Sequence, residues 1–139
     1  YPDRTAELAI LDGHGVTTKL AELQPVVSRH ELAAMIRHVR EIHMASALKS
    51  YLVDISDTSR RHPSIELGLS PRATLQMAAA ARAHAAARGR SYTTPDDVKA
   101  IAVPALAHRL VLRADRGARM SADDAVAEIL AEVPVPVAG

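Results

Sequence analysis

Arg72 stands where an arginine could do chemistry, because Ser70 and Pro71 directly before it predict the start of a helix. Serine is a favoured N-cap, and proline suits the first helical position, where its missing N–H costs nothing. The free N–H groups and the positive dipole end of a helix start favour an anion, and an arginine adds a forked, permanently charged donor. Two interpretations stay open: Arg72 binds a ligand such as a phosphate, or it is solvated or paired with a nearby acid.

Other chemistry has little support among the residues. The chain has no glycine-rich phosphate loop with its lysine, and no apolar strand that ends in paired acids to hold magnesium. Because there is no cysteine, disulfides, thiolate metal sites and cysteine catalysis are excluded. Because the phosphate loop and the magnesium-binding acids are missing, we expect no ATP cleavage by this chain alone. We also predict no metal site, since no two of the seven histidines are four residues apart: His14, His30, His38, His43, His62, His84 and His108.

The composition favours a helical domain. A chain of 139 residues has the length of one ordinary domain, and 48% of its residues are apolar, yet the only aromatic residues are three tyrosines. Thin aliphatic side chains suit closely packed helices better than a β-sandwich. No apolar run approaches the roughly 20 residues of a membrane span, and the lack of cysteine makes a cytoplasmic location the expectation.

The charges are unevenly spread, although the net charge is only +1. Residues 60–90 carry six arginines against the single acid Glu66. This segment is either a solvated face or the place where an anion binds. The basic segment 60–90 is also compatible with a helical domain that binds nucleic acid. Against that alternative, three tyrosines offer few stacking platforms, and the basic residues are scattered along several elements.

Apolar periodicity and helix start signals predict an all-α fold, a bundle of about six helices with no convincing sheet. Residue 104 is a proline, which predicts a kink or break in the helix that begins at residue 95. We expect the helical domain to span residues 1–133 and a proline-rich tail to follow at 134–139. The expected helices cover residues 2–11, 29–43, 47–62, 71–88, 95 onward and 122–133, with an extended connector at 64–69.

Several local signals set the expected boundaries. Ser28 and Glu31 have the capping-box spacing, and Thr94 with Pro95 repeats the cap-and-proline pattern of Ser70. Gly89 is expected to be a left-handed helix cap, and Gly68 to supply a backbone conformation that side chains disfavour. The helix after Ser28 is expected to bury one apolar stripe, formed by Leu32, Met35, Ile36, Val39 and Ile42.

Six segments stand in order along nearly the whole chain: 1–4 with 7–11, 51–53, 58–63, 67–73, 89–98 and 106–110. Together they resemble the C-terminal part of MoxR-type AAA+ ATPases, which are relatives of the magnesium-chelatase ATPase subunit. No single segment is decisive, but six in register form a specific match. The sequence departs from the pattern at residues 12–15, which are glycine-rich where more helix is expected.

The resemblance implies a helical lid domain that closes over ATP held by a separate AAA+ core. It places the family's sensor 2 arginine, which reaches the γ-phosphate, at Arg72, and it makes Ser70, Pro71 and Arg72 the cofactor-binding segment. ATP and Mg²⁺ would be held mainly by the core of the parent protein, so this chain is not expected to bind either of them tightly.

The resemblance also implies partners. These are the lid's own AAA+ core, the neighbouring subunits of a ring that we expect to be hexameric, and von Willebrand A-domain proteins as a class connected with chaperone-like remodelling. No membrane partner is expected. The residues leave two alternatives, a basic nucleic-acid-binding domain and a helical protein-interaction module, and in the second of these Arg72 would have no special role.

Overall fold

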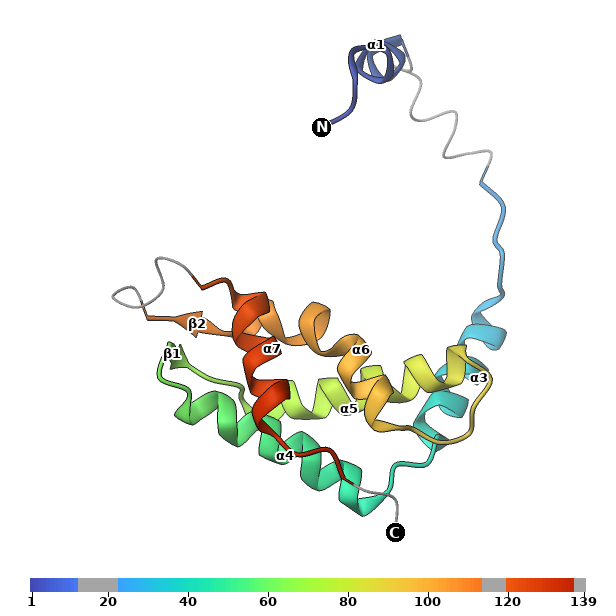
Figure 1. Ribbon diagram of the computed structural model, residues 1–139. Helices are drawn as coiled ribbons and strands as arrows, with labels where there is room; N and C mark the ends of the chain where they lie inside the picture. The colour runs from blue at the N-terminus through green and yellow to red at the C-terminus, as the bar shows by residue number, and fades with distance from the viewer. Residues whose placement is uncertain (13–22, 114–119, 137–139) are drawn as a thin grey trace. The chain divides into compact units, whose positions relative to one another are not determined.

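The computed structural model describes residues 1–12, 23–113 and 120–136, in a chain that divides into two units, Tyr1–Ala33 and Ala34–Gly139 (Figure 1). The predicted all-α fold is confirmed, with a small sheet added. The glycine-rich residues 13–15, where the resemblance leads us to expect more helix, lie outside the described residues. The described elements are α1 (Arg4–Asp12), α3 (Arg29–Glu41), α4 (Ser46–Arg61), β1 (Ile65–Leu67), α5 (Pro71–Ala87), α6 (Pro95–Leu106), the 3₁₀ helix η1 (Ala107–Arg109), β2 (Val111–Leu112) and α7 (Ala122–Glu132).

Helix α3 begins where its capping signal predicts. The Glu31 N–H donates to Ser28 Oγ at 3.1 Å, and the Ser28 N–H donates to Glu31 Oε2 at 2.7 Å. These bonds satisfy two N–H groups that a helix start otherwise leaves unpaired. The helix runs to Glu41, two residues short of the predicted end.

The prediction that α3 buries an apolar stripe is wrong. None of its residues is buried, and the side chains of Leu32, Met35 and Ile36 are 49%, 53% and 47% exposed. Of the expected stripe only Ile42 is buried, and it follows the last residue of the helix. The apolar spacing is present in the sequence, but burial also requires a neighbouring surface against which these side chains can pack.

The core of the second unit lies among α4, α5, α6 and α7, which Figure 1 shows as neighbouring helices. Helix α5 packs most extensively against α6, and it faces the core with one row of residues spaced four apart: Ala73, Met77, Ala81 and Ala85. The other helices contribute aliphatic side chains such as Leu52, Ile55, Val98 and Ile129. Each fully buried aliphatic side chain stabilises the fold by about 1.5 to 3 kcal/mol.

Helix ends in this unit follow the sequence signals closely, with one exception. Helix α4 stops at Arg61, just before His62 and Pro63, and Gly89 adopts the left-handed conformation (φ 71°) after α5. Of the kink or break predicted at Pro104, the break does not occur there, since α6 continues to Leu106 before changing to η1. Pro104 and Ala100 are both exposed, so water can bind the Ala100 carbonyl, which lacks an N–H donor at residue 104.

A two-stranded antiparallel sheet joins parts of the chain that sequence periodicity does not connect. Ile65 pairs with Leu112 and Leu67 with Val111, and the Arg113 N–H extends the pairing to the Ser64 carbonyl at 2.9 Å. The sequence predicted an extended connector at 64–69 but no sheet. Strands of two and three residues are too short to show an alternation of apolar and polar side chains, so they can be recognised only from their pairing in the structure.

No helix among the described residues is long and apolar enough to cross a membrane.

Candidate functional site at the start of helix α5

Helix α5 begins at the residues that the sequence singled out. Ser70 has an extended backbone (φ −78°, ψ 160°), and its Oγ accepts the Ala73 N–H at 3.3 Å. Its carbonyl accepts the Thr74 N–H at 3.2 Å, and Pro71 occupies the first helical position. The predicted cap is therefore confirmed. Because Ala73 is buried against the core, the first turn of α5 has a defined orientation on the unit.

Arg72 lies exposed in this first turn. Among the residues that the structure describes, no hydrogen bond or ion pair involves its side chain; the ion pairs instead involve Arg60, His62, His84 and Arg90. The structure thus gives no support to pairing of Arg72 with a nearby acid. No carboxylate of the described residues pairs with the guanidinium, which leaves it available to an anion at the positive end of the helix.

The main chain just before α5 is held by the last turn of α4. Ser59 Oγ accepts the Leu69 N–H at 2.9 Å, and Arg60 Nε donates to the Leu69 carbonyl at 2.8 Å. A Cβ on Gly68 would lie 2.8 Å from main-chain atoms of Ser59 and Arg60. The expected reason for this glycine was wrong: Gly89 is the one glycine with positive φ among the described residues, and Gly68 is needed for close approach.

A second polar cluster, which the sequence did not predict, joins the C-terminal part of α5 to the start of α6. Asp97 is 1% exposed, and its carboxylate accepts hydrogen bonds from Arg90 Nη1 at 2.7 Å and from His84 Nδ1 at 2.7 Å. The N–H and hydroxyl of Thr94 donate to the same carboxylate at 2.7 and 3.0 Å. The Arg90 guanidinium is the main cause that holds the pKa of Asp97 well below its usual range, with help from His84 and Thr94.

This cluster links the C-terminal part of α5 to the start of α6, and it is poorly suited to bind an anion. The Arg90 guanidinium is already bound to a buried carboxylate, so its charge is compensated. Thr94 and Pro95 predicted the helix start at this place, but no pattern in the sequence indicates that Arg90 and His84 converge on the Asp97 carboxylate.

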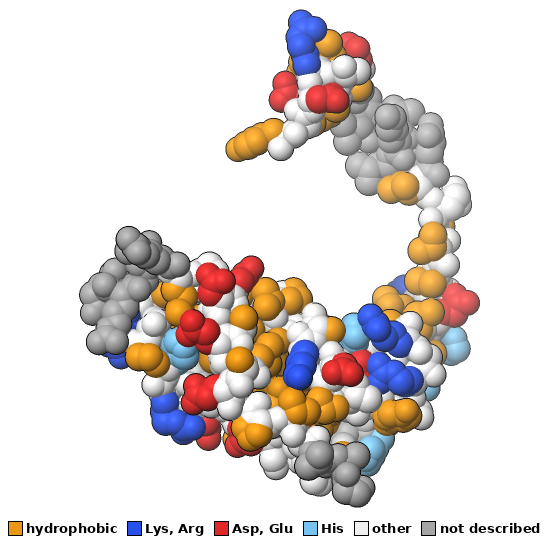
Figure 2. Space-filling model, in the orientation of Figure 1, with side chains coloured by type: hydrophobic (Ala, Val, Ile, Leu, Met, Phe, Trp, Pro, Cys, Tyr) orange, Lys and Arg blue, Asp and Glu red, His pale blue; other side chains and the backbone are white. Residues whose placement is uncertain are grey.

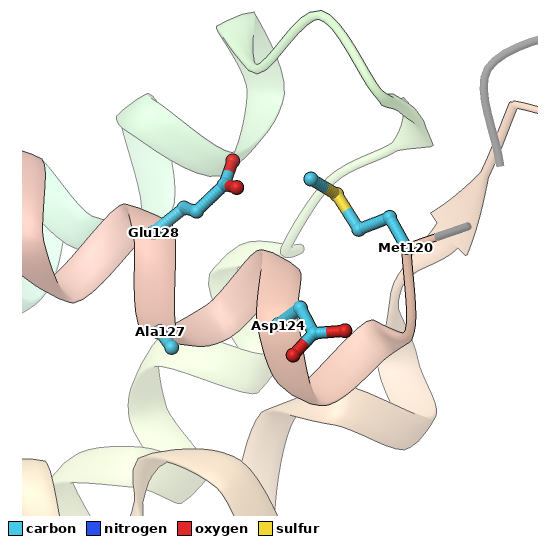
Figure 3. A pocket seen from close by; sticks show the side chains of 4 residues that line it. All are labelled: Met120, Asp124, Ala127 and Glu128. Carbon is cyan, nitrogen blue, oxygen red and sulfur yellow. The ribbon is translucent and has the colours of Figure 1, made fainter.

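A hollow beside α7 is a second place where a ligand could bind, and its charge can be compared with that of the start of α5. Figure 3 shows the side chains of Met120 and Glu128 extending toward one another over this hollow, which Asp124 and Ala127 also line. Two carboxylates and no basic side chain line it, so it would repel a phosphate. Of these two places, the start of α5 is the better candidate for an anion.

The charges on the surface bear on the nucleic-acid alternative. On the face drawn in Figure 2, Lys and Arg side chains of the second unit are separated by acidic and apolar ones and form no continuous stripe. A continuous basic surface is the usual electrostatic footprint of nucleic-acid binding. Within the described ranges, no group of three or more His, Asp or Glu side chains is arranged to hold a metal ion.

Comparison with known proteins agrees with this fold. A family model described as the AAA lid domain matches residues 57–129, more than half of the chain and a range that includes Arg60 and Arg72. Chaperone MoxR1 of Mycobacterium tuberculosis is 31% identical over 146 residues, covering 98% of this chain and 38% of its own length. Protein MoxR of Paracoccus denitrificans is 30% identical over 142 residues, covering 90% and 42%.

Two further relatives extend the match over almost the whole chain. The uncharacterized protein YeaC of Bacillus subtilis is 33% identical over 138 residues, which cover 99% of this chain and 43% of YeaC. A crystal structure of a candidate ATPase from Cytophaga hutchinsonii shares the fold with a TM-score of 0.80, at 22% identity over 99% of this chain and 44% of that one.

The fold and the matched region define a helical lid of the AAA+ class. The chain belongs to the AAA lid domain family, of the type found in MoxR proteins. It spans less than half the length of each of these relatives.

Proposed function

We propose that this chain is the lid of a longer MoxR-type ATPase, in which it closes over ATP bound by the AAA+ core and presents Arg72 to the terminal phosphate as the sensor 2 residue. The observation that carries the proposal is the exposed Arg72 guanidinium, which has no described partner, in the first turn of a Ser70-capped helix. Ser70 and Pro71 set the start of that helix, and the resemblance to MoxR-type ATPases makes a sensor 2 arginine the expectation at this position.

The residues at the start of α5 fit a nucleotide phosphate. Arg72 offers a planar fork of N–H donors that matches phosphate oxygens, and the dipole of α5 adds partial positive charge at the same end. The described part of the chain holds no set of side chains suited to Mg²⁺, so ATP and Mg²⁺ would be held mainly by the core. When bound there, ATP and Mg²⁺ supply the phosphoryl-transfer chemistry, and this chain supplies one positioned cation.

The proposal extends to the assembly. The lid would contact its own core and a neighbouring subunit of a ring, which we take to be a hexamer. The name of Chaperone MoxR1 supports a chaperone-like remodelling role. Partners that contain von Willebrand A domains, a class connected with the MoxR type, are the partner class that we propose.

The decisive experiment is steady-state ATP hydrolysis by the parent protein carrying Arg72→Ala. Because an arginine that meets charge on a transferred phosphoryl group can contribute on the order of 10³-fold in rate, we expect a loss of kcat of that order. Arg72→Lys should rescue poorly, since lysine lacks the planar fork. Arg88→Ala, an exposed arginine just past the other end of α5, is the matched control and should keep normal turnover.

Wild-type turnover in Arg72→Ala would refute the sensor assignment. The same substitution in residues 1–139 should leave the melting temperature nearly unchanged, because the side chain is exposed and the structure gives it no bond to a described residue. A large fall in that temperature would show that Arg72 is structural.

A further inference from the structure

We propose that Arg60 is a positioning residue for Arg72: with Ser59, it fixes the main chain of Leu69 and so sets the place and direction in which α5 begins. The inference rests on the proposed function of Arg72. It adds a residue to the site that is twelve positions away in the sequence, on a different helix.

Two consecutive residues of α4 bind both polar main-chain atoms of one residue. The Leu69 N–H donates to Ser59 Oγ at 2.9 Å, while the Leu69 carbonyl accepts Arg60 Nε–H at 2.8 Å. Leu69 directly precedes the N-cap Ser70 and lies three residues before Arg72. With its N–H and carbonyl both held, the peptide groups on either side of Leu69 cannot rotate freely, so the entry into α5 has a defined direction.

The two holding groups are themselves fixed. Ser59 is completely buried, and its hydroxyl donates to the Ser56 carbonyl at 2.6 Å. The Arg60 guanidinium also binds Asp57 Oδ1 through Nη1 at 2.8 Å, which orients the fork so that Nε faces Leu69. Gly68 completes the arrangement, because a Cβ there would lie 2.8 Å from the Arg60 N and Cα atoms and would push the segment away from α4.

Because Arg60 is partly exposed, its effect on the position of α5 can be distinguished from an effect on the stability of the fold. The side chains of Arg60 and Asp57 are 43% and 40% exposed, and an ion pair at such a surface contributes little to folding. Other contacts hold the body of α5 on the unit, including the buried row from Ala73 to Ala85. Losing Arg60 should therefore leave the fold intact but allow the segment just before Arg72 to move. A displacement of about 1 Å in a residue that positions a reacting group can cost about 100-fold in rate.

The test uses the parent protein and four variants: Arg60→Gln, Arg72→Ala, the double substitution, and Arg82→Gln as the matched control. Arg82 Nε donates to the Ile42 carbonyl at 3.1 Å, so the control removes the same kind of bond from another part of α5. For Arg60→Gln we expect kcat to fall by about 10- to 100-fold. KM for ATP should change by less than about twofold, because the lost interaction acts in the transition state. Arg82→Gln should turn over normally.

The double variant shows whether Arg60 acts through Arg72. If it does, adding Arg60→Gln to Arg72→Ala slows hydrolysis no further, since two residues that act as a unit are not additive. A double variant slower than Arg72→Ala by the full Arg60→Gln factor would overturn the inference. Arg60→Lys keeps the charge but cannot bind Asp57 and Leu69 with one planar fork, so full turnover in that variant would also overturn it.

The remaining outcomes separate this inference from the proposed function. Normal turnover of Arg60→Gln beside an impaired Arg72→Ala would reject the positioning role and leave the sensor assignment standing. Normal turnover of Arg72→Ala would reject the sensor assignment and the inference with it. A melting temperature of Arg60→Gln far below that of Arg82→Gln would show that Arg60 is structural.

Discussion

At the scale of single residues, three arginines of the basic segment have different environments. Arg72 is exposed and has no bond to a described residue, Arg60 binds a main-chain carbonyl and Asp57, and Arg90 is bound to the buried carboxylate of Asp97. The sequence placed all three in one cationic stretch. Their neighbours decide which of them is available to a ligand, because a guanidinium already bound to a carboxylate offers little charge to another anion.

The buried carboxylate of Asp97 gives a prediction about stability and pH. Asp97→Asn should lower the free energy of unfolding by about 2 to 3 kcal/mol at pH 7, because the uncompensated Arg90 must then return to solvent. The pKa of Asp97 is lowered on folding, so the unfolded state takes up a proton first and the stabilisation is lost as the pH falls below about 4. The difference between wild type and Asp97→Asn should therefore shrink in that range.

Denaturant unfolding at pH 7 and at several values below pH 4 measures this difference. Asp96→Asn is the matched control, since Asp96 is the exposed neighbour in the same helical turn and should change stability by only a few tenths of a kcal/mol. A constant gap between wild type and Asp97→Asn across that range would contradict the assignment of the charge to Asp97.

At the scale of elements, the helix starts depend on short hydroxyl caps. Ser28, Ser70 and Ser121 each accept an N–H from three residues on, at 3.1, 3.3 and 3.0 Å. The caps of α3 and α7 are completed by an acidic side chain at the third helical position, whereas α5 has none in its first turn. The first turn of α5 thus has no carboxylate of its own, which favours an anion there over a cation.

Ser70→Ala should lower the free energy of unfolding by about 1 kcal/mol with the helical content retained, because one N–H group at the start of α5 loses its partner. Ser70→Gly should lower the free energy of unfolding by only a few tenths of a kcal/mol. Chemical denaturation followed by circular dichroism measures both. Ser50→Ala, at an exposed position within α4, is the control and should not destabilise. An unchanged midpoint for Ser70→Ala would show that the cap does not stabilise this helix.

At the scale of the whole molecule, the chain is a lid whose core is made by α4 to α7, and its relatives are more than twice as long. In the function that we propose, this lid supplies Arg72 to a nucleotide that the core of the parent protein mainly holds. The sequence has neither a phosphate loop nor paired acids for magnesium.

Purified residues 1–139 should therefore hydrolyse no ATP above background, as measured by phosphate release with excess ATP and Mg²⁺. A parallel preparation carrying Arg72→Ala controls for a contaminating ATPase, because a contaminant would be unaffected by the substitution. Turnover that disappears with Arg72→Ala would mean that the chain forms a complete catalytic site.

The sequence by itself determined the helix starts at Ser28, Ser70 and Thr94 and the place of Arg72 in the first turn of α5. Each of these depends on residues within four positions of one another, where local chemistry is decisive. Only the tertiary structure decided the β1–β2 pairing, the exposure of Leu32, Met35 and Ile36, and the hold of Arg60 on Leu69. The pairing and the hold join residues far apart in the chain, and the exposure depends on which surface lies opposite. No periodicity or spacing in the sequence encodes such contacts.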